Sequence, residues 1–438
     1  MTSRCLISYP YMALRVFTAG AALGAGLLQT FVFARVLAPE RFSLFIFIAA
    51  LGYSLYLADA GVVKVLFVNL RRRFLQNKSL GAIAGQATAI FVLYSALAAF
   101  ASVICFLALA SRFNYSTVDS AELTLFFVFN ALNLPWLALR YFSIAIDEYF
   151  HLEILEASRR GLNIVALVAL LSGLPVLVFL LLINAGWLAA IFAAVVRLWQ
   201  RRAFGGSFRR SVVYLATFLR RNGRQLFSSA VYSVSETYIY NFPYFLVPWA
   251  YGLGAPTIIL DTTFKVFRSA NQFYGAACDI LVPRQTRALA ERDGPTMIRA
   301  TWLAAALCSV PAAAACGVLI FAAAKVFAVL LGRAATMPPA TTPVLIMLLI
   351  ANLVQMVSHS TLVNNGYFKE VARISLGLVA ALTAVAAFAV WAHLDIVQFL
   401  NAYAAVYTCG ALATVALMIR GPIRLAHEVP GAPAVAPR

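Results

Sequence analysis

The stretch PTIILDTTFKVFRSANQFYGAACDILV, residues 256–282, is long and apolar enough to cross a bilayer as a helix, yet it carries ionisable side chains. Its polar residues recur at spacings of four, three, four and seven, which places them on one helical face: Asp261, Lys265, Arg268, Gln272 and Asp279. Each charge near mid-membrane costs about 2.5 to 3.5 kcal/mol on an insertion scale, so this face must turn toward protein or water. We expect it to border a polar pathway.

Similar apolar stretches recur along the whole chain, in which 63% of the 438 residues are apolar and only 11% are charged. Soluble domains do not have this composition, and the runs are too long for barrel strands. The sequence therefore predicts an all-α, multi-pass integral membrane protein with about twelve transmembrane helices. The predicted spans are residues 12–36, 43–68, 84–110, 122–146, 156–174, 176–198, 225–250, 256–282, 300–330, 340–365, 371–393 and 396–420.

The basic residues indicate the orientation of these spans. With a cytoplasmic N-terminus, 24 of the 34 Lys and Arg residues, Arg159 and Arg160 among them, fall in inner segments and four fall in outer segments. This bias predicts that both termini are cytoplasmic. It also explains the net charge of +18 without a nucleic-acid partner, because the basic residues flank the membrane. The first span leads directly into the second, and we expect it to remain as an uncleaved signal anchor.

The spans group into two sets of six on either side of a basic stretch. We predict an N-terminal half at 1–196, a basic cytoplasmic linker at 197–224, a C-terminal half at 225–420 and a cytoplasmic tail at 421–438. Duplicated halves are typical of transporters that bind cargo at a central interface and expose it to each side in turn. This organisation predicts a secondary transporter.

Catalytic and metal sites are not evident in the sequence. The six cysteines lie mostly within apolar runs without a pairing or metal-ligand spacing, so we interpret them as small core residues. The outer loops are too short to build a catalytic domain, and we expect neither enzymatic activity nor a cofactor. A membrane-embedded glycan-modifying enzyme, for example an acyltransferase centred on His359, stays an alternative.

Two segments resemble a known family. ARVLAPERFSLFIFIAALGYSLYLADAGVVKVLF, residues 34–67, has an Ala-Arg-x-Leu-x-Pro turn, an aromatic-x-x-Phe element with Ser43 in the place of the usual glycine, and Ala-Asp-x-Gly. FYGAACDILVPRQTRALAERD, residues 273–293, is similar to the ending of the family's eighth span. Together they resemble the polysaccharide and O-antigen flippases of the multidrug/oligosaccharidyl-lipid/polysaccharide (MOP) superfamily, although these motifs cover about one eighth of the chain.

This resemblance implies a MATE-like architecture and a flippase in a bacterial cytoplasmic membrane. Its cargo would be a lipid-linked oligosaccharide, with undecaprenyl pyrophosphate as the expected carrier. Enzymes of polysaccharide assembly would be potential partners, and H⁺ or Na⁺ would be the coupling ion. A MATE-like multidrug or cation antiporter is the nearest alternative. Such an antiporter would be expected to have an anionic cavity, whereas basic residues outnumber acidic residues within these spans.

The polar faces of several spans supply the candidate site. Arginine and lysine would bind a pyrophosphate, and hydroxyl and amide groups would bind sugars. The candidate substrate-binding residues are Arg268, Lys265, Asp261, Gln272, Arg140, Glu236, Asn352 and Gln355. The candidate conformational or ion-coupling residues are Asp59, Lys64 and Asp279.

Some of these residues also have a structural interpretation. Asp261 and Lys265 are four residues apart and would neutralise each other as an ion pair. Glu236 would pair with Arg268 or carry a coupling proton. Arg15 and Lys325 lie near span ends, where their side chains would reach the lipid headgroups.

Overall fold

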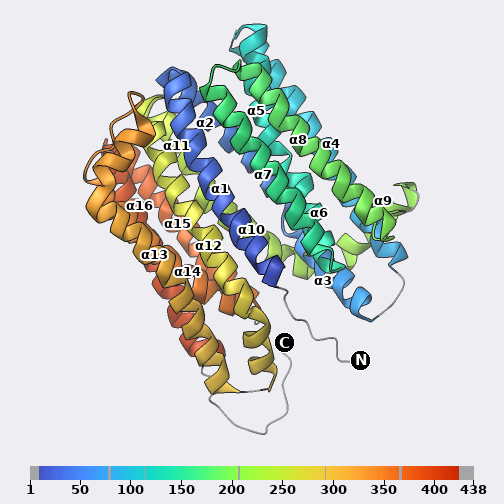
Figure 1. The fold of residues 1–438 in the computed structure, drawn as a ribbon. Coiled ribbons are helices and arrows are strands. Elements are labelled where there is room, and N and C mark those ends of the chain that lie inside the picture. The colour runs from blue at the N-terminus through green and yellow to red at the C-terminus, as the bar shows by residue number, and fades with distance from the viewer. Residues whose placement is uncertain are drawn as a thin grey trace. The chain divides into compact units, whose positions relative to one another are not determined.

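A computed structural model describes this protein at residues 9–76, 80–113, 115–205, 208–291, 293–364 and 367–423. All regular elements in these ranges are helices, so the predicted all-α class is confirmed for the described part of the chain. The chain divides into two compact units, residues 1–248 and 249–438 (Figure 1). Each unit is a bundle of helices packed side by side.

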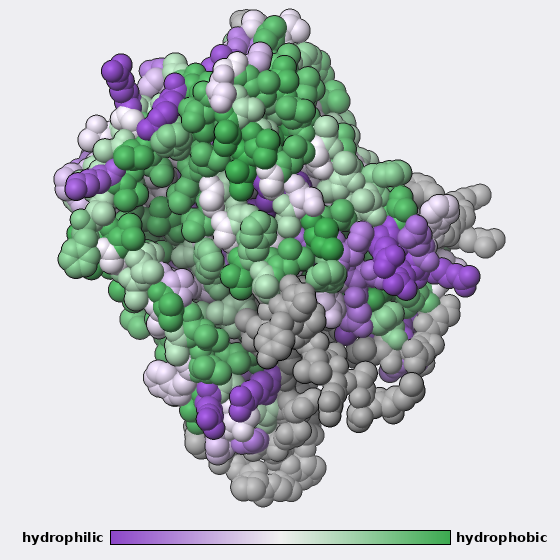
Figure 2. All heavy atoms as spheres, viewed as in Figure 1, coloured by the Kyte–Doolittle hydropathy of each residue, from purple (hydrophilic) through white to green (hydrophobic). Residues whose placement is uncertain are grey.

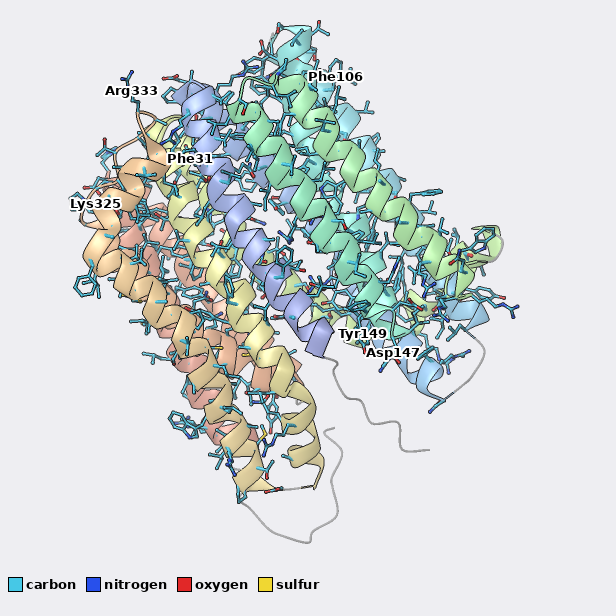
Figure 3. The ribbon with its side chains drawn as sticks, viewed as in Figure 1. Phe31, Phe106, Asp147, Tyr149, Lys325 and Arg333 are labelled. Atoms are coloured by element: carbon cyan, nitrogen blue, oxygen red, sulfur yellow. The ribbon has the colours of Figure 1, made fainter. Side chains whose placement is uncertain are left out.

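Unit 1 is built from ten helices, with a 3-10 turn between the second and third. They are α1 (Tyr9–Val36), α2 (Pro39–Ser54), η1 (Leu55–Asp59), α3 (Val62–Leu75), α4 (Gly81–Leu107), α5 (Thr117–Ala131), α6 (Asn133–Ala145), α7 (Tyr149–Leu171), α8 (Val176–Gln200), α9 (Phe208–Arg221) and α10 (Gly223–Asn241). Helix α1 packs along α7, and α4 contacts α5, α6 and α9. In Figure 3, Asp147 and Tyr149 lie at one end of this unit and Phe106 lies toward the other.

Unit 2 is built from five long helices. They are α12 (Ala255–Glu291), α13 (Gly294–Leu331), α14 (Thr341–Asn364), α15 (Phe368–Trp391) and α16 (Ile396–Met418), and α11 (Pro243–Tyr251) contains the boundary between the units. Helix α12 packs against α13 and α14, and α14 packs against α16. Local signals set the helix starts: the Asp293 side chain caps α13, and Asp395 with Gln398 forms a capping box on α16.

Three predicted spans are interrupted rather than continuous. The 43–68 span breaks between η1 and α3, where Ala60 and Gly61 have positive φ angles of 42° and 72°. The 122–146 span divides into α5 and α6, and the 225–250 span divides into α10 and α11. Pro243 begins α11, as expected for a residue that lacks an amide hydrogen. The first break has no proline.

Other predicted boundaries were wrong. Helix α12 continues to Glu291, so most of the predicted inner loop after residue 282 is helical. Helix α7 begins at Tyr149 rather than at residue 156, which brings Glu153 into the helix.

Nine helical segments of the described residues are long and apolar enough to cross a membrane. They support a multi-pass membrane protein, and Figure 2 shows a largely hydrophobic face. The predicted spans at 156–174, 225–250 and 256–282 form helices but are not among these nine segments. The count of twelve and the cytoplasmic location of the termini stay predictions.

Aromatic side chains fill much of the core in both units. In unit 1, Phe33 lies within 6.1 Å, centroid to centroid, of four other rings. In unit 2, Phe264 packs on Tyr403 at 5.3 Å and Phe267 on Tyr407 at 5.2 Å, which joins α12 to α16. These contacts fix the rotation of α12, and with it the direction of its polar stripe.

Candidate functional site

The polar stripe of unit 2 begins with an ion pair. The Asp261 carboxylate lies 2.6 Å from the Lys265 ammonium, and Asp261 is buried. The Arg268 guanidinium follows one turn later, half-buried and 6.0 Å from the centroid of the Phe264 ring. Gln272 is exposed on the surface of the unit, and the Asp279 side chain lies outside the described part of the chain. The pair predicted from spacing is thus present, with Arg268 as the next cation along α12.

Asn352 on α14 connects three helices beside this stripe. Its amide nitrogen donates to the Phe267 carbonyl at 3.3 Å, and its carbonyl oxygen accepts from the Tyr407 hydroxyl at 3.3 Å. Asn352 is only 1% exposed, which indicates a packing role that also positions α12. Gln355, one turn later, is half-buried, and its carbonyl oxygen has no hydrogen-bond partner among the described residues.

Asp59 holds the break between η1 and α3 in unit 1. Its buried carboxylate accepts from the backbone N–H groups of Gly61 and Val63, each at 3.1 Å, and from the Tyr94 hydroxyl at 2.7 Å. The Gly61 and Val63 N–H groups are at the start of α3, where backbone donors have no acceptor within the helix. The geometry is consistent with the conformational role predicted for Asp59.

Lys64 and Glu236 meet around a tyrosine. The Lys64 ammonium lies 4.8 Å from the centroid of the Tyr232 ring, a cation–π distance, and the charge of Glu236 acts on it. The Tyr232 hydroxyl donates to the Glu236 carboxylate. Within unit 1, these contacts join α3 to α10; the pairing of Glu236 with Arg268 stays a prediction.

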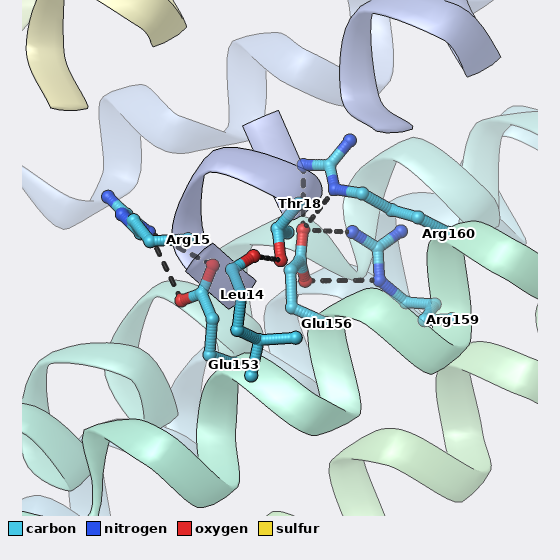
Figure 4. A network of polar contacts seen from close by, with 7 residues as sticks. All are labelled: Leu14, Arg15, Thr18, Glu153, Glu156, Arg159 and Arg160. Atoms are coloured by element: carbon cyan, nitrogen blue, oxygen red, sulfur yellow. Dashed lines mark hydrogen bonds and ion pairs between the residues drawn. The ribbon is translucent and has the colours of Figure 1, made fainter. Parts of the chain in front are cut away.

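Sequence analysis missed a charged network on α7 (Figure 4). The Glu156 carboxylate lies 2.6 Å from the Arg159 guanidinium and 2.7 Å from that of Arg160. The Arg159 guanidinium also lies 3.7 Å from the centroid of the Trp187 ring on α8, and its side chain is only 9% exposed. These arginines were predicted to lie at the inner membrane edge, and the structure places them within the bundle.

A second ion pair extends this network to α1. The Arg15 guanidinium lies 3.2 Å from the Glu153 carboxylate, and Glu153 is buried (Figure 4). Arg15 was expected to reach lipid headgroups, so this contact corrects that prediction. The signal in the sequence was the three-residue spacing from Glu153 to Glu156 and on to Arg159, which puts them on adjacent turns of one helix.

Arg140 on α6 adds a further positive charge to the network. Its charge acts on Glu156 and on Tyr56. Arg159 and Arg160 share the single carboxylate of Glu156, so these three residues carry one net positive charge. A site of this kind would attract an anionic group.

A set of ion pairs fixes the loop between α6 and α7. The Arg71 guanidinium lies 2.7 Å from the Asp147 carboxylate, and Arg197 and Arg201 both pair with Glu148. Partial burial raises the pKa of Glu148, but the hydrogen bonds and charges of the two arginines lower it more, so the pKa lies below its ordinary value. These pairs connect α3 and α8 at one end of unit 1.

Among the described residues, no group of three or more His, Cys, Asp or Glu side chains is arranged to hold a metal ion. The two buried cysteines that lie nearest each other, Cys278 and Cys308, have sulfur atoms 4.0 Å apart and are free thiols.

Sequence comparison finds no protein-family model that matches this chain, and no curated protein matches it. Comparison of structures does find similar folds. An inward-facing multidrug resistance MATE family transporter of the MOP superfamily has a TM-score of 0.60 and 14% identity, over 94% of this chain and 98% of that one. A Vibrio cholerae MATE transporter in its bent form has a TM-score of 0.59 and 12% identity, over 95% and 96%.

A third similar structure differs in the character of its site. A MOP superfamily transporter from Pyrococcus furiosus, described as having a binding pocket of reverse polarity that suggests a different function, has a TM-score of 0.55 and 13% identity, over 95% of this chain and 97% of that one. At these identities the likeness shows the fold, which is that of MATE transporters. The MATE-like architecture implied by the resemblance is thus supported, and the cargo stays a prediction.

Proposed function

We propose that this protein is a MATE-like secondary transporter that moves its cargo across a bacterial cytoplasmic membrane by alternating access. The observation that carries the proposal is the fold, which is similar to an inward-facing MATE transporter over 94% of this chain. Buried or half-buried charges in both units support it. A charged side chain within a membrane-length helix is costly, so such residues usually pair with one another or line the path of a substrate or ion. The coupling ion would be H⁺ or Na⁺.

A multidrug or cation antiporter is the first candidate for the cargo, because multidrug transporters are among the proteins with this fold. In such a transporter Glu236 or Asp261 would exchange the coupling ion for a cationic substrate. Each carboxylate interacts with a lysine: Glu236 with the charge of Lys64, and Asp261 with Lys265 in an ion pair. When the cargo or the coupling ion binds a carboxylate, it would replace the lysine as its partner.

A lipid-linked oligosaccharide flippase is the second candidate, and one observation favours it. Arg159 and Arg160 share the single carboxylate of Glu156 and so have surplus positive charge, and Arg268 adds a cation in unit 2. A pyrophosphate headgroup would bind such groups. The P. furiosus transporter, with its reverse-polarity pocket, supports the idea that the polarity of cargo varies on this fold.

The experiment is transport by the full chain in proteoliposomes with an imposed H⁺ or Na⁺ gradient. One arm measures ethidium, a cationic dye, and the other measures a fluorescent saccharide linked to undecaprenyl pyrophosphate. We expect gradient-dependent movement of at least one. Movement of ethidium alone supports the antiporter, and movement of the lipid alone supports the flippase. Absence of both, with folded protein in the vesicles, contradicts the proposal.

Arg268→Gln separates the cargo classes further. Loss of a charge-assisted hydrogen bond to a pyrophosphate should slow movement of the lipid by about tenfold or more, and Arg268→Lys should keep part of it. Transport of a cationic dye should not slow. Arg333→Gln is the matched control, because this arginine is exposed and precedes α14 in a loop. Equal slowing by both glutamine variants would discard Arg268 as a cargo residue.

A further inference from the structure

Helix α9, Phe208–Arg221, has a composition unlike that of the other helices in unit 1. Its sequence, FRRSVVYLATFLRR, contains four arginines at its two ends, no acidic residue and an apolar middle. It lies in the basic stretch predicted as a linker, and it is too short to cross a membrane. The cargo proposals leave this helix without a role.

One face of α9 is fixed to unit 1. Ser211, Leu215 and Phe218 are buried, and the Gln86 side chain on α4 donates to the Tyr214 carbonyl at 3.1 Å. Gly85 permits this close packing, since a Cβ atom there would lie 3.0 Å from the Ser211 hydroxyl oxygen. The bundle therefore sets the rotation of α9, and its remaining surfaces point in fixed directions.

The rest of the surface of α9 is partly apolar and partly cationic. Val212, Val213 and Leu219 are 44%, 59% and 38% exposed, and Arg220 and Arg221 are also exposed. Val212 and Leu219 are seven residues apart and so lie on one flank of the buried face, whereas Arg221 lies on the opposite flank. A helix with exposed aliphatic side chains beside arginines fits a boundary between acyl chains and headgroups better than bulk water.

The neighbouring elements place α9 beside membrane-spanning helices. Trp199, in the last turn of α8, is largely exposed, as tryptophans at a membrane interface are. Arg202 follows at the same end of α8 and is exposed, whereas Arg197 and Arg201 pair with Glu148 there. Figure 2 shows hydrophilic residues gathered at this end of unit 1, next to a hydrophobic face. Arg202, together with Arg220 and Arg221 of α9 itself, therefore makes this end of unit 1 attractive to anions.

We propose that α9 lies in the membrane interface and binds anionic phospholipid headgroups through Arg220 and Arg221, with Val212 and Leu219 inserted among the acyl chains. The positive charge of the helix and the absence of acidic residues in it favour an anionic lipid over a zwitterionic one. Because α9 is anchored on α4, lipid bound there would stabilise the end of unit 1. This inference does not depend on the cargo.

Amide hydrogen exchange of the full chain in nanodiscs tests the proposal. Peptides from α9 should exchange more slowly in nanodiscs with equal phosphatidylglycerol and phosphatidylcholine than in phosphatidylcholine alone. Each surface arginine contributes about fivefold, so two give a difference of roughly 30-fold. Arg220→Gln/Arg221→Gln should remove the difference, and Arg333→Gln, far from α9 in the sequence, should keep it. Free glycerol phosphate should not replace the lipid.

Two further variants show whether exchange reports the docked helix. Gly85→Leu should detach α9 from α4 and speed its exchange in both lipids. Val212→Ser should speed exchange where lipid is bound. Equal exchange in the two lipids, or a difference that survives the double arginine variant, overturns the proposal. If the α9 amides are protected from exchange in native membranes but not in nanodiscs with phosphatidylglycerol, the proposal is also overturned. That result would indicate a protein partner.

Discussion

Replacing Glu156 with alanine is expected to destabilise unit 1 by about 3–5 kcal/mol, the usual cost of removing one partner from a buried ion pair. The Glu156 carboxylate contacts the guanidinium groups of Arg159 and Arg160, and without it two cations remain in a largely buried position. The Trp187 ring would offset only part of the loss, since a cation–π contact contributes about 0.5–2 kcal/mol. The variant should unfold at a lower denaturant concentration.

Unfolding in mixed micelles, followed by tryptophan fluorescence, measures this effect. Glu40→Ala is the matched control, because Glu40 is exposed in the first turn of α2 and its loss should cost less than about 1 kcal/mol. A triple change of Glu156, Arg159 and Arg160 to leucine should recover much of the stability, since no charge is then left unpaired. If the Glu156→Ala variant unfolds at the same denaturant concentration as the Glu40→Ala variant, the network does not stabilise the bundle.

Gly61→Val should be the most damaging single change at the break in the second predicted span. Gly61 has a φ of 72°, and a Cβ atom there would lie 2.0 Å from the Ser229 hydroxyl oxygen on α10. Left-handed backbone costs a side chain about 1–2 kcal/mol and overpacking about 1–3 kcal/mol, so we expect a loss of roughly 2–5 kcal/mol. Transport should fall along with stability, because α3 and α10 could no longer pack here.

Two comparisons isolate the cause. Gly161→Ala, on α7, adds a methyl group in open space and should be neutral or slightly stabilising. Ser229→Gly should recover much of the steric part of the loss in Gly61→Val but not the backbone part. A Gly61→Val protein as stable as wild type would mean that α3 and α10 do not approach each other at this point.

The long apolar runs were enough to predict a helical membrane protein, because twenty apolar residues have few other stable arrangements in lipid. The 176–198 and 396–420 spans correspond closely to α8 and α16, whose sequences are continuously apolar and bounded by Pro175 and by the Asp395 cap. Spacing along one helix also predicted the Asp261 and Lys265 pair, since such a contact depends only on local geometry.

Features that depend on tertiary contacts were missed. The break at Gly61 follows Asp59, whose carboxylate accepts a hydrogen bond from the Tyr94 hydroxyl on another helix. A hydropathy pattern cannot predict such a hydrogen bond. Arg159 and Arg160 were assigned to the membrane edge because basic residues usually lie there, but Glu156 and Trp187 compensate for their burial. Asn352 was predicted as a cargo residue from its face alone; its hydrogen bonds connect α12, α14 and α16, which sequence did not reveal, and its role in cargo binding stays a prediction.

Alternating access is best tested by distances between spin labels on the two units in a protein whose six cysteines have been replaced. One pair, at Arg112 and Arg333, lies on predicted outer segments, and the other, at Gln76 and Arg284, lies on predicted inner segments; all four side chains are exposed. A MATE-like transporter should show two distance populations for each pair, and a change of pH or Na⁺ that shortens one distance should lengthen the other. A single unchanged distance at both ends under all these conditions would contradict alternating access.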